Sequence, residues 1–340
     1  WGSGQKGNEG AFLSALDKNP QLKGVVLEET PWLLNAKDER ERKRRIALFF
    51  DLNRMANEET TALNKLQEMQ LPSGAWSWWS GMQPSRYITQ HIVAGFAHLQ
   101  QLGAWRTDPD APASRMVENA VRWLDQEVEE TYQRELKRIK DGGTPSVTAE
   151  DIHYVYARSA FERYPLERKK NSAVHHILQV IERDWLKYGL QEQAMIAMAL
   201  HRLEPRSGTP ALVLESLAQR ATMSDELGMY WKDFTSGYLW NQLPIETHAL
   251  MIEAFDAVGK DRTRVEALRQ YLLKLKQTSD WKTTKATADA CYALLLTGDD
   301  LLGPKSAPRI EVGGKPVDAE PAEAGTGYFQ RTWQGIDVQP

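Results

Sequence analysis

Cysteine is nearly absent from this sequence, since the 340 residues contain only Cys291. A single thiol excludes an intrachain disulfide framework and any zinc site built from several cysteines. Cys291 stands among apolar residues of an expected helix, whereas a nucleophilic cysteine needs an accessible setting that lowers its pKa. We therefore expect Cys291 to be a buried structural thiol.

A charge excess of one sign and long apolar runs are missing as well. Lysine and arginine (42 residues) nearly balance aspartate and glutamate (46 residues), which leaves a formal net charge of −4. A chain so near neutrality has no electrostatic footprint for nucleic acid. The sequence also has no run of about 18 apolar residues that could span a membrane. We expect no nucleic-acid partner and no membrane insertion of this chain.

Metal-binding and cofactor motifs are missing too. None of the seven histidines lies in an H-E-x-x-H or C-x-x-C setting. His91 and His98 are seven residues apart and should share a helix face, but no carboxylate stands beside them in the sequence to complete a ligand set. His248 would join a site only if it faced the mouth of the fold. We predict no metal, no cofactor and no catalytic residue, and we expect hydrogen-bonded or exposed histidines.

Helical periodicity is what the sequence does contain. Between Glu9 and Thr297, segments of roughly 12–25 residues carry apolar side chains at steps of three and four, with Pro, Gly, Ser and Asp between them. One such stripe is formed by Val174, Ile177, Ile181 and Trp185. After Pro308 the pattern changes to short alternating runs that are typical of strands. We predict an all-α body over residues 1–302 and a β segment over residues 303–340.

Three parts of the chain repeat a common plan of a tryptophan-bearing turn, a helix with a threonine near its start, and a closing glycine. In chain order the repeats contain Trp76, Thr89, Gly95 and Gly103, then Trp231, Thr247, Ala254 and Gly259, then Trp281, Thr287, Ala293 and Gly298. We expect the threonines to satisfy free backbone donors, the small residues to allow close helix approach, and the glycines to be left-handed beyond the helix ends. The three tryptophans should be structural residues of the turns.

Repeated helix pairs must stack on one another to bury their apolar faces. About six pairs around an axis would account for ~300 residues and would form an α/α toroid. The repeats differ too much for a regular solenoid, and no distinct capping repeat is present. We therefore expect a closed ring, with an open solenoid as the alternative.

The first turn holds two further tryptophans, Trp78 and Trp79. Indole rings at a rim can anchor a protein partner or stack on a sugar. Packing of both rings against the helix ends is the alternative interpretation. Trp78 and Trp79 are therefore candidate partner-binding residues.

Five segments resemble one family of large bacterial proteins. They are LEETPW (Leu27–Trp32), ALFFDLNRM (Ala47–Met55), SGAWSWWSGMQPSRYITQHIVAGFAHLQQLG (Ser73–Gly103), TTKATADACYALL (Thr283–Leu295) and GTGYFQRTW (Gly325–Trp333). Together they resemble the bacterial alpha-2-macroglobulin-like proteins, and the likeness covers nearly the whole chain. Its most specific part is the tryptophan-rich turn with the helix that follows it.

The resemblance implies both a fold and a function. In that family an α/α toroid, similar in shape to terpenoid cyclases and complement thioester domains, is inserted in a β domain of the CUB type. The chain after Pro308 would return into this β domain. The implied function is part of a protease trap, whose partners are target proteases, bound by the full-length parent, and the neighbouring β domains. The implied location is extracytoplasmic, in the periplasm, outer membrane or cell surface, as a lipoprotein or secreted protein.

The sequence departs from the family at one motif. Thioester-bearing members join a Cys to a Gln within C-x-E-Q, and no such run occurs here. The chain opens at Trp1 rather than Met, so we expect a piece of a longer parent with this motif upstream. A parent that lacks the motif is the alternative. Two other functions stay open: an α/α-toroid carbohydrate-active enzyme, either a glycosidase or a lyase, which the 12 tryptophans would suit, and a structural scaffold.

Overall fold

The computed structural model describes residues 52–105, 108, 111–139, 143–232, 244–278, 281, 283–296, 311–312 and 315–316. Most of these residues are helical, which confirms the all-α class. The chain divides into two compact units, Leu63–Thr297 on the one hand and Trp1–Ala62 with Gly298–Pro340 on the other. The predicted border between residues 302 and 303 lies outside the described residues and stays a prediction.

The described helices follow one another with short connections. In chain order they are α5 (Leu52–Met69), α6 (Arg86–Gln101), α7 (Pro112–Arg138), α8 (Ala149–Ser159), α9 (Ala173–Asp184), η1 (Trp185–Lys187), α10 (Leu190–Leu203), α11 (Thr209–Arg220), α12 (Pro244–Ala254), η2 (Phe255–Gly259), α13 (Arg262–Thr278) and α14 (Thr284–Leu296). Within the part of the chain described, no helix is both long and apolar enough to cross a membrane.

Side-chain caps fix where several helices begin. The hydroxyl of Ser85 accepts a hydrogen bond from the backbone N–H of Ile88 at the start of α6, and Ser172 acts in the same way at the start of α9. At the start of α8 the bonds are reciprocal. Thr148 accepts from the N–H of Asp151, and the Asp151 carboxylate accepts from the N–H of Thr148. Local sequence therefore sets these boundaries.

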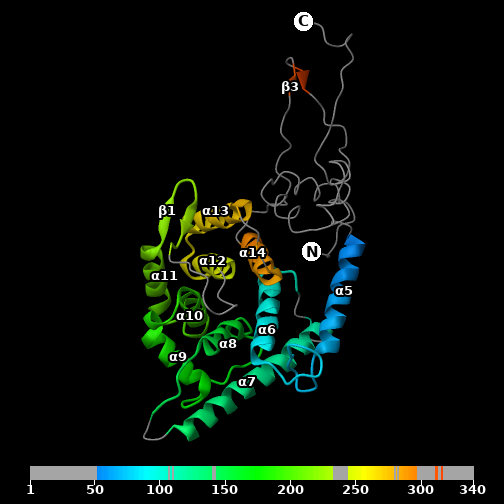
Figure 1. The fold of residues 1–340 in the computed structure, drawn as a ribbon, viewed down its shortest axis with the longest axis vertical. Helices are drawn as coiled ribbons and strands as arrows, with labels where there is room; N and C mark the ends of the chain where they lie inside the picture. Colours follow the sequence, from blue (N-terminus) through cyan, green and yellow to red (C-terminus); the bar gives the residue numbers. More distant parts are fainter. Residues whose placement is uncertain are drawn as a thin grey trace. The chain divides into compact units, whose positions relative to one another are not determined.

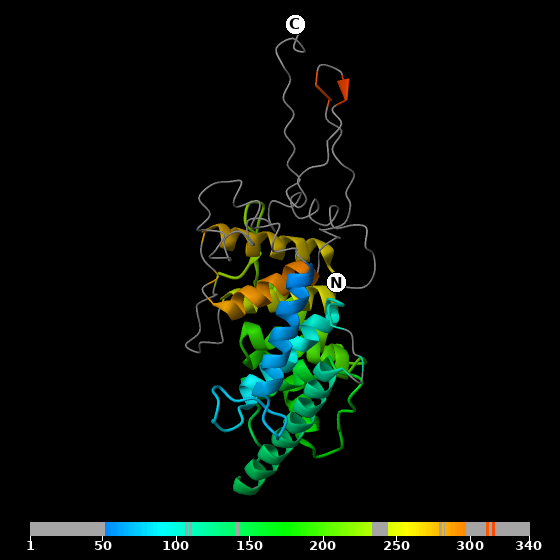
Figure 2. The same ribbon diagram turned by 90° about the vertical axis from the view of Figure 1, so that its right-hand side faces the viewer.

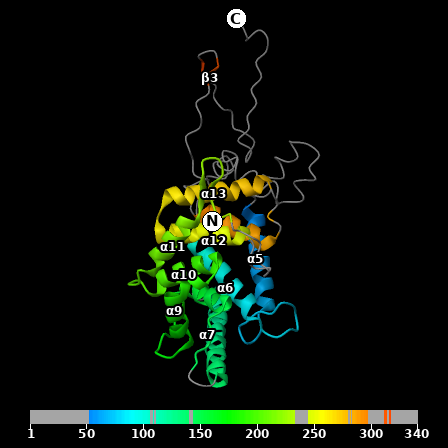
Figure 3. The ribbon, with the colours of Figure 1, turned by 60° about the vertical axis from the view of Figure 1, so that its left-hand side comes forward.

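Helices that are two places apart in the chain pack against each other. α6 contacts α8, α8 contacts α10, α10 contacts α12, and α12 contacts α14. The other helices cover this series: α7 lies against α6, α9 and α11 lie against α10, and α13 lies against α12, as Figure 1 and Figure 3 show from two sides. The last turns of α7 extend past its neighbours (Figure 2), and its buried residues end at Val128.

The helices of this series and the helices that cover it differ in how much of their surface is buried. In α9 only one face is buried, and it contains Val174, Ile177 and Ile181, three residues of the predicted stripe. In α10 every residue from Glu192 to Leu200 is buried. A helix that is buried all round has neighbours on every side, so α10 lies inside the unit and α9 on its surface.

The tryptophan-bearing turns pack into the core at the ends of helices. The buried Trp76 donates its indole N–H to the carbonyl of Leu66 at 2.8 Å. Trp231, also buried, donates its indole N–H to the carbonyl of Leu217 at 3.0 Å. Trp281 is buried with the Lys276 ammonium 5.2 Å from its ring centroid, a cation–π distance.

One detail of the predicted repeat is confirmed and another is wrong. The hydroxyl of Thr89 satisfies a free backbone donor, because it accepts a hydrogen bond from the N–H of Trp76 at 3.0 Å and so joins the turn to the helix. The donor belongs to the turn, since Thr89 lies inside α6 and Ser85 takes the cap position. Gly95 is not needed for close helix approach, because a Cβ atom there would meet nothing within 4 Å.

The closing glycines also differ from one another. Gly103 is left-handed with φ 66°, as predicted. In the second repeat the left-handed residue is Lys260 (φ 49°) and not Gly259. The reason is the wider π turn η2, which places the end of the helix one residue later. The third closing glycine, Gly298, lies outside the described residues.

A short antiparallel hairpin interrupts the helices, which the helical periodicity did not predict. β1 (Thr222–Ser224) pairs with β2 (Gly228–Tyr230), with Met223 opposite Met229. Gly228 has φ 83°, and any Cβ there would clash with the carbonyl oxygen of Ala267 in α13. In the other unit, β3 (Glu311–Val312) pairs with β4 (Lys315–Pro316) within the predicted β segment.

Alanine should have opposite effects at two glycines. At Gly74, where φ is 93° and a Cβ would lie 2.5 Å from the carbonyl oxygen of Asn119, alanine should lower the free energy of unfolding by about 1–3 kcal/mol. At Gly95, inside α6 with open space around it, alanine should raise that free energy by about 0.5–1 kcal/mol. Urea unfolding followed by circular dichroism measures both, and a loss of stability in both variants would contradict this description.

Candidate functional site

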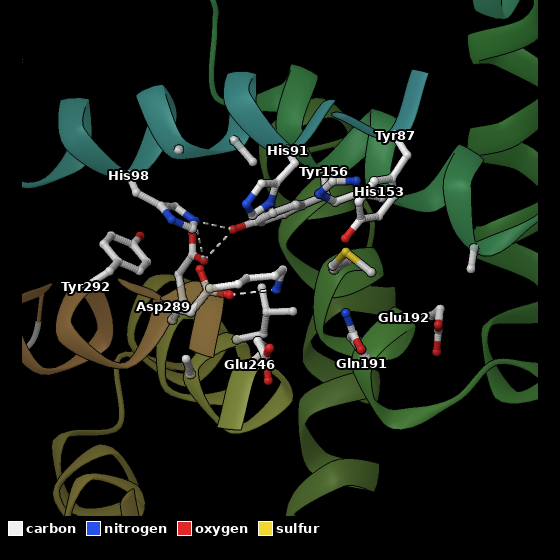
Figure 4. A pocket seen from close by; sticks show the side chains of 18 of the residues that line it. Tyr87, His91, His98, His153, Tyr156, Gln191, Glu192, Glu246, Asp289 and Tyr292 are labelled. Atoms are coloured by element: carbon white, nitrogen blue, oxygen red, sulfur yellow. Dashed lines mark hydrogen bonds and ion pairs between the residues drawn. The ribbon is translucent and has the colours of Figure 1, made fainter. Parts of the chain in front are cut away.

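A cavity of about 110 Å³ lies inside the helical unit, and α6, α8, α10, α12 and α14 all contribute to its walls. Histidine, tyrosine and carboxylate side chains from these helices point toward one another around it (Figure 4). A cavity of about 150 Å³ takes up benzene. The volume here therefore suits a group of a few heavy atoms.

The cavity-facing residues follow the helical repeat. On α6 they begin with Tyr87 and His91 and end with His98, and on α12 they begin with Glu246 and end with Glu253. Steps of three and four residues keep these side chains on one helix face. The sequence thus presents a polar stripe to the inside of the unit, where an ordinary helix of a core would present an apolar one.

Glu253 is the centre of a buried cluster at the floor of the cavity, and its residue is 1% exposed. Its carboxylate accepts hydrogen bonds from the hydroxyl of Tyr156 at 2.6 Å and from Nη2 of Arg202 at 3.0 Å. Because Tyr156 donates its proton to Glu253, its oxygen accepts from Nε2 of His98, 2.9 Å away. This assigns the proton of the neutral His98 ring to Nε2.

The same cluster reaches α14 through ring stacking. The His98 ring lies parallel to that of Tyr292, with centroids 3.8 Å apart and planes 8° apart. The Tyr292 hydroxyl donates to Oε1 of Gln101 on α6. One contiguous set of contacts therefore includes α6, α8, α10, α12 and α14.

Electrostatics favour a charged Glu253–Arg202 pair. Burial alone would raise the pKa of Glu253, but His98, Arg202 and the Tyr156 hydroxyl outweigh it and hold that pKa below its ordinary value. Burial would likewise lower the pKa of Arg202, yet the neighbouring Glu253 carboxylate raises it. The pair is thus ionised throughout the neutral pH range.

The imidazole ring of His153, which also lines the cavity, is uncharged. Arg86 Nε donates to Oε1 of Gln90 at 2.7 Å, which orients the amide so that its Nε2 donates to Nδ1 of His153 at 3.1 Å. The imidazole proton is therefore on Nε2. Burial, with the nearby His91, Lys285 and Arg86, lowers the pKa of His153 to about 3. Burial also lowers the pKa of His91.

Glu246 differs from Glu253 because its carboxylate forms no ion pair within the described residues. It is 0% exposed, and neither carboxylate oxygen has a partner at hydrogen-bonding geometry among the described residues. Burial raises its pKa, and its own backbone N–H, Lys285 and Thr283 offset only part of that rise. The ammonium of Lys285 donates instead to Asp289 at 2.8 Å.

The candidate tryptophans Trp78 and Trp79 are 41% and 67% exposed. The Trp78 ring is parallel to that of Tyr87, with centroids 5.8 Å apart, and Tyr87 in turn stacks on His91 at 6.3 Å. An aromatic column thus leads from the surface to the cavity. The structural tryptophans Trp76, Trp231 and Trp281 do not line the cavity.

Other sequence expectations need correction. Cys291 is half-buried on α14, not buried, because its apolar sequence neighbours lie on other faces of the helix. His248 does not line the cavity; it is buried with Nε2 2.8 Å from the carbonyl of Leu268, and burial lowers its pKa to about 4. His98 is hydrogen-bonded as expected. His91 instead faces the cavity without a hydrogen-bond partner among the described residues.

Sequence reasoning missed the cavity because its parts lie far apart in the chain. Glu253 meets Tyr156 across 97 positions. The one available signal was the spacing of His91 and His98. In the described part of the chain, no group of three or more His, Cys, Asp or Glu side chains could hold a metal ion.

No protein-family model matches the chain, and no curated protein matches its sequence. The resemblance to the alpha-2-macroglobulin-like proteins therefore remains a hypothesis, supported by its motifs.

Tyr156→Phe should lower the free energy of unfolding by about 1.5–3 kcal/mol, because it removes a hydrogen bond to the buried Glu253 carboxylate. Tyr188→Phe is the matched control, since the Tyr188 hydroxyl donates to a neutral acceptor, the carbonyl of Val147 at 3.2 Å. Its cost should be only about 0.5–1.5 kcal/mol. Urea unfolding of both variants measures the difference, and equal costs would contradict the role assigned to Glu253.

Acid should destabilise the protein through His153. Its pKa is about 3 in the folded state, below the ordinary 6.5, so between these values the unfolded chain binds more protons. The stabilisation is complete above pH 6.5 and is lost as the pH falls toward 3, with a slope of up to about 1.4 kcal/mol per pH unit. Urea unfolding between pH 7 and 5 should show a shallower slope for His153→Gln. His201→Gln, at an exposed site on α10, is the control that should keep the wild-type slope.

Proposed function

We propose that the helical unit is an α/α toroid that serves as the thioester-type domain of an alpha-2-macroglobulin-like protease trap. The main observation that supports the toroid is the cavity, because α6, α8, α10, α12 and α14 all contribute to its walls. These helices contact one another in sequence, and the stacking of His98 on Tyr292 links the last to the first. An open solenoid would keep its first and last helices apart.

The direction of the inner helices supports the same proposal. His98, Tyr156, Glu253 and Tyr292 all come from late turns of their helices and meet at the cavity floor. Helices α6, α8, α12 and α14 therefore run in one direction, as they would in a ring of repeated helix pairs. The segment of strongest family resemblance, Ser73–Gly103, forms α6 and the turn before it.

The trap function is inferred from the family motifs in the sequence. The chain contains no C-x-E-Q run, so it cannot form a thioester from its own residues. In this proposal the domain supports capture by the full-length parent, outside the cytoplasm and beside neighbouring β domains. No residue of the chain is assigned a catalytic role.

A toroid that acts as a glycosidase or lyase is the second candidate, because several carboxylates line the cavity. A glycosidase needs two carboxylates that can both reach the scissile bond. Of the carboxylates that line the cavity, Glu253 is ion-paired to Arg202, Asp289 is bonded to Lys285, and Glu246 has no exposed surface, which leaves only Glu150 and Glu192 for such a role. The family motifs in the sequence favour the trap over the enzyme, and a scaffold without partners is the remaining alternative.

The test uses the full-length parent and trypsin. After mixing, trypsin should still hydrolyse a small chromogenic peptide but should lose most of its activity on a large protein substrate, because the trap surrounds it. Trypsin inactivated beforehand at its active-site serine is the control and should not be captured, since it cannot cleave the parent. Equal activity on small and large substrates, or capture of the inactive protease, would contradict the trap.

A further inference from the structure

The loop before α6 carries a group of exposed apolar side chains, which we call the Trp79 patch. It consists of Trp79 (67% exposed), Met82 (47%) and Trp78 (41%). The loop projects from the helices, as Figure 2 and Figure 3 show from two sides. Single exposed apolar residues are common on protein surfaces, but adjacent ones that form a patch are typical of interaction sites.

Hydrogen bonds and ring stacking fix the shape of the Trp79 patch. The backbone N–H of Met82 and the hydroxyl of Ser77 both donate to the carbonyl of Trp79, at 3.1 and 2.8 Å. The Trp78 ring is stacked on that of Tyr87, and its centroid lies 5.9 Å from that of Trp79, with the two indole planes 30° apart. The exposed indole of Trp79 is therefore held in place before any ligand arrives, which lowers the entropic cost of binding.

The segment that carries the patch is uncharged. The sequence has no Asp, Glu, Lys or Arg between Glu68 and Arg86, although 26% of the whole chain is charged. Ser80 and Gln83, which lie beside the patch in the sequence, are exposed. Their hydroxyl and amide groups can both donate and accept hydrogen bonds without a charge. This surface therefore complements an uncharged ligand that has an apolar face and hydroxyl groups at its edge.

The area of the Trp79 patch suits a small ligand better than another protein. Its three side chains together expose on the order of 350 Å², given roughly 250 Å² for a large aromatic side chain that is fully exposed. A standard protein interface covers about 800 Å² on each partner. A second copy of this chain, or another protein, would need more apolar surface than the patch offers.

We propose that the Trp79 patch binds a neutral saccharide whose rings carry equatorial hydroxyl groups, such as β-1,4-linked glucose. The faces of such a ring hold only C–H bonds, and one of them stacks on the exposed indole of Trp79. Hydroxyl groups at the edge of the ring exchange hydrogen bonds with Ser80 and Gln83. Met82 extends the apolar surface beneath the next sugar unit. Binding here is independent of the proposed trap function.

Saturation-transfer difference NMR of the full 340-residue chain with cellotriose tests the proposal. We expect a dissociation constant on the order of 1 mM, with the strongest transfer to the axial ring protons, because these face the indole. Transfer to α-1,2-linked mannotriose should be weaker, since its axial hydroxyl groups interrupt one face of each ring. Hexaproline, an uncharged peptide, should receive none. Absence of transfer to cellotriose, or equal transfer to mannotriose or hexaproline, overturns the proposal.

Three variants locate the saccharide. Trp79→Ala should weaken cellotriose binding about tenfold or more, because it removes the stacking surface. Gln83→Ala should weaken it about two- to tenfold, the equivalent of one neutral hydrogen bond. Leu186→Ala is the matched control and should bind as the wild type does, since Leu186 lies on η1 and is exposed to the same fraction as Trp79, 67%.

Thermal unfolding shows whether each variant is folded. All three substitutions are at exposed positions, so the unfolding temperature should stay at the wild-type value. If Trp79→Ala nevertheless unfolds early, Gln83→Ala decides the test. Unchanged affinity in the folded Trp79 or Gln83 variant, or a loss of affinity in Leu186→Ala, would place the saccharide elsewhere and overturn the proposal.

Discussion

The arrangement of the helices around the cavity depends on one buried carboxylate, that of Glu253. It accepts a hydrogen bond from Tyr156 and a charged hydrogen bond from Arg202. The hydroxyl oxygen of Tyr156 in turn accepts a hydrogen bond from His98. The stack of His98 on Tyr292 then includes the last described helix. Breaking a buried ion pair by removing one partner costs about 3–5 kcal/mol. This single site thus couples helices that are remote in the sequence.

The polar groups at the floor of the cavity, around Glu253, and those in its upper part, at Glu246 and His91, differ in how well they are hydrogen-bonded. At the floor, each polar group has a partner, and a fully satisfied network of this kind rigidifies the helices that contribute to it. In the upper part, Glu246 and His91 line the cavity without hydrogen-bond partners in the described residues. Partly satisfied polar groups are costly to bury, so they are typical of sites that receive a ligand. The floor therefore maintains the fold, whereas the part of the cavity around Glu246 and His91 contributes less to it.

The sequence predicted the helices, because their signals are local. The stripe in α9 and the glycine at position 103 are examples, since periodicity and a helix-end glycine act within a few residues. The hairpin β1–β2 was missed because its glycine is required by a distant contact, the approach of Gly228 to Ala267. The cavity was missed for the same reason. Nothing in the sequence links Glu253 to Tyr156 on α8 or to Arg202 on α10, and only the fold brings these side chains together.

Amide hydrogen exchange in the native state tests the central claim most directly. Wild type and Glu253→Gln would be compared helix by helix. Our account predicts that the substitution lowers protection together in α6, α8, α10, α12 and α14, because all five share the contacts of one carboxylate. A loss of protection confined to α12, with the other four helices unchanged, would contradict it.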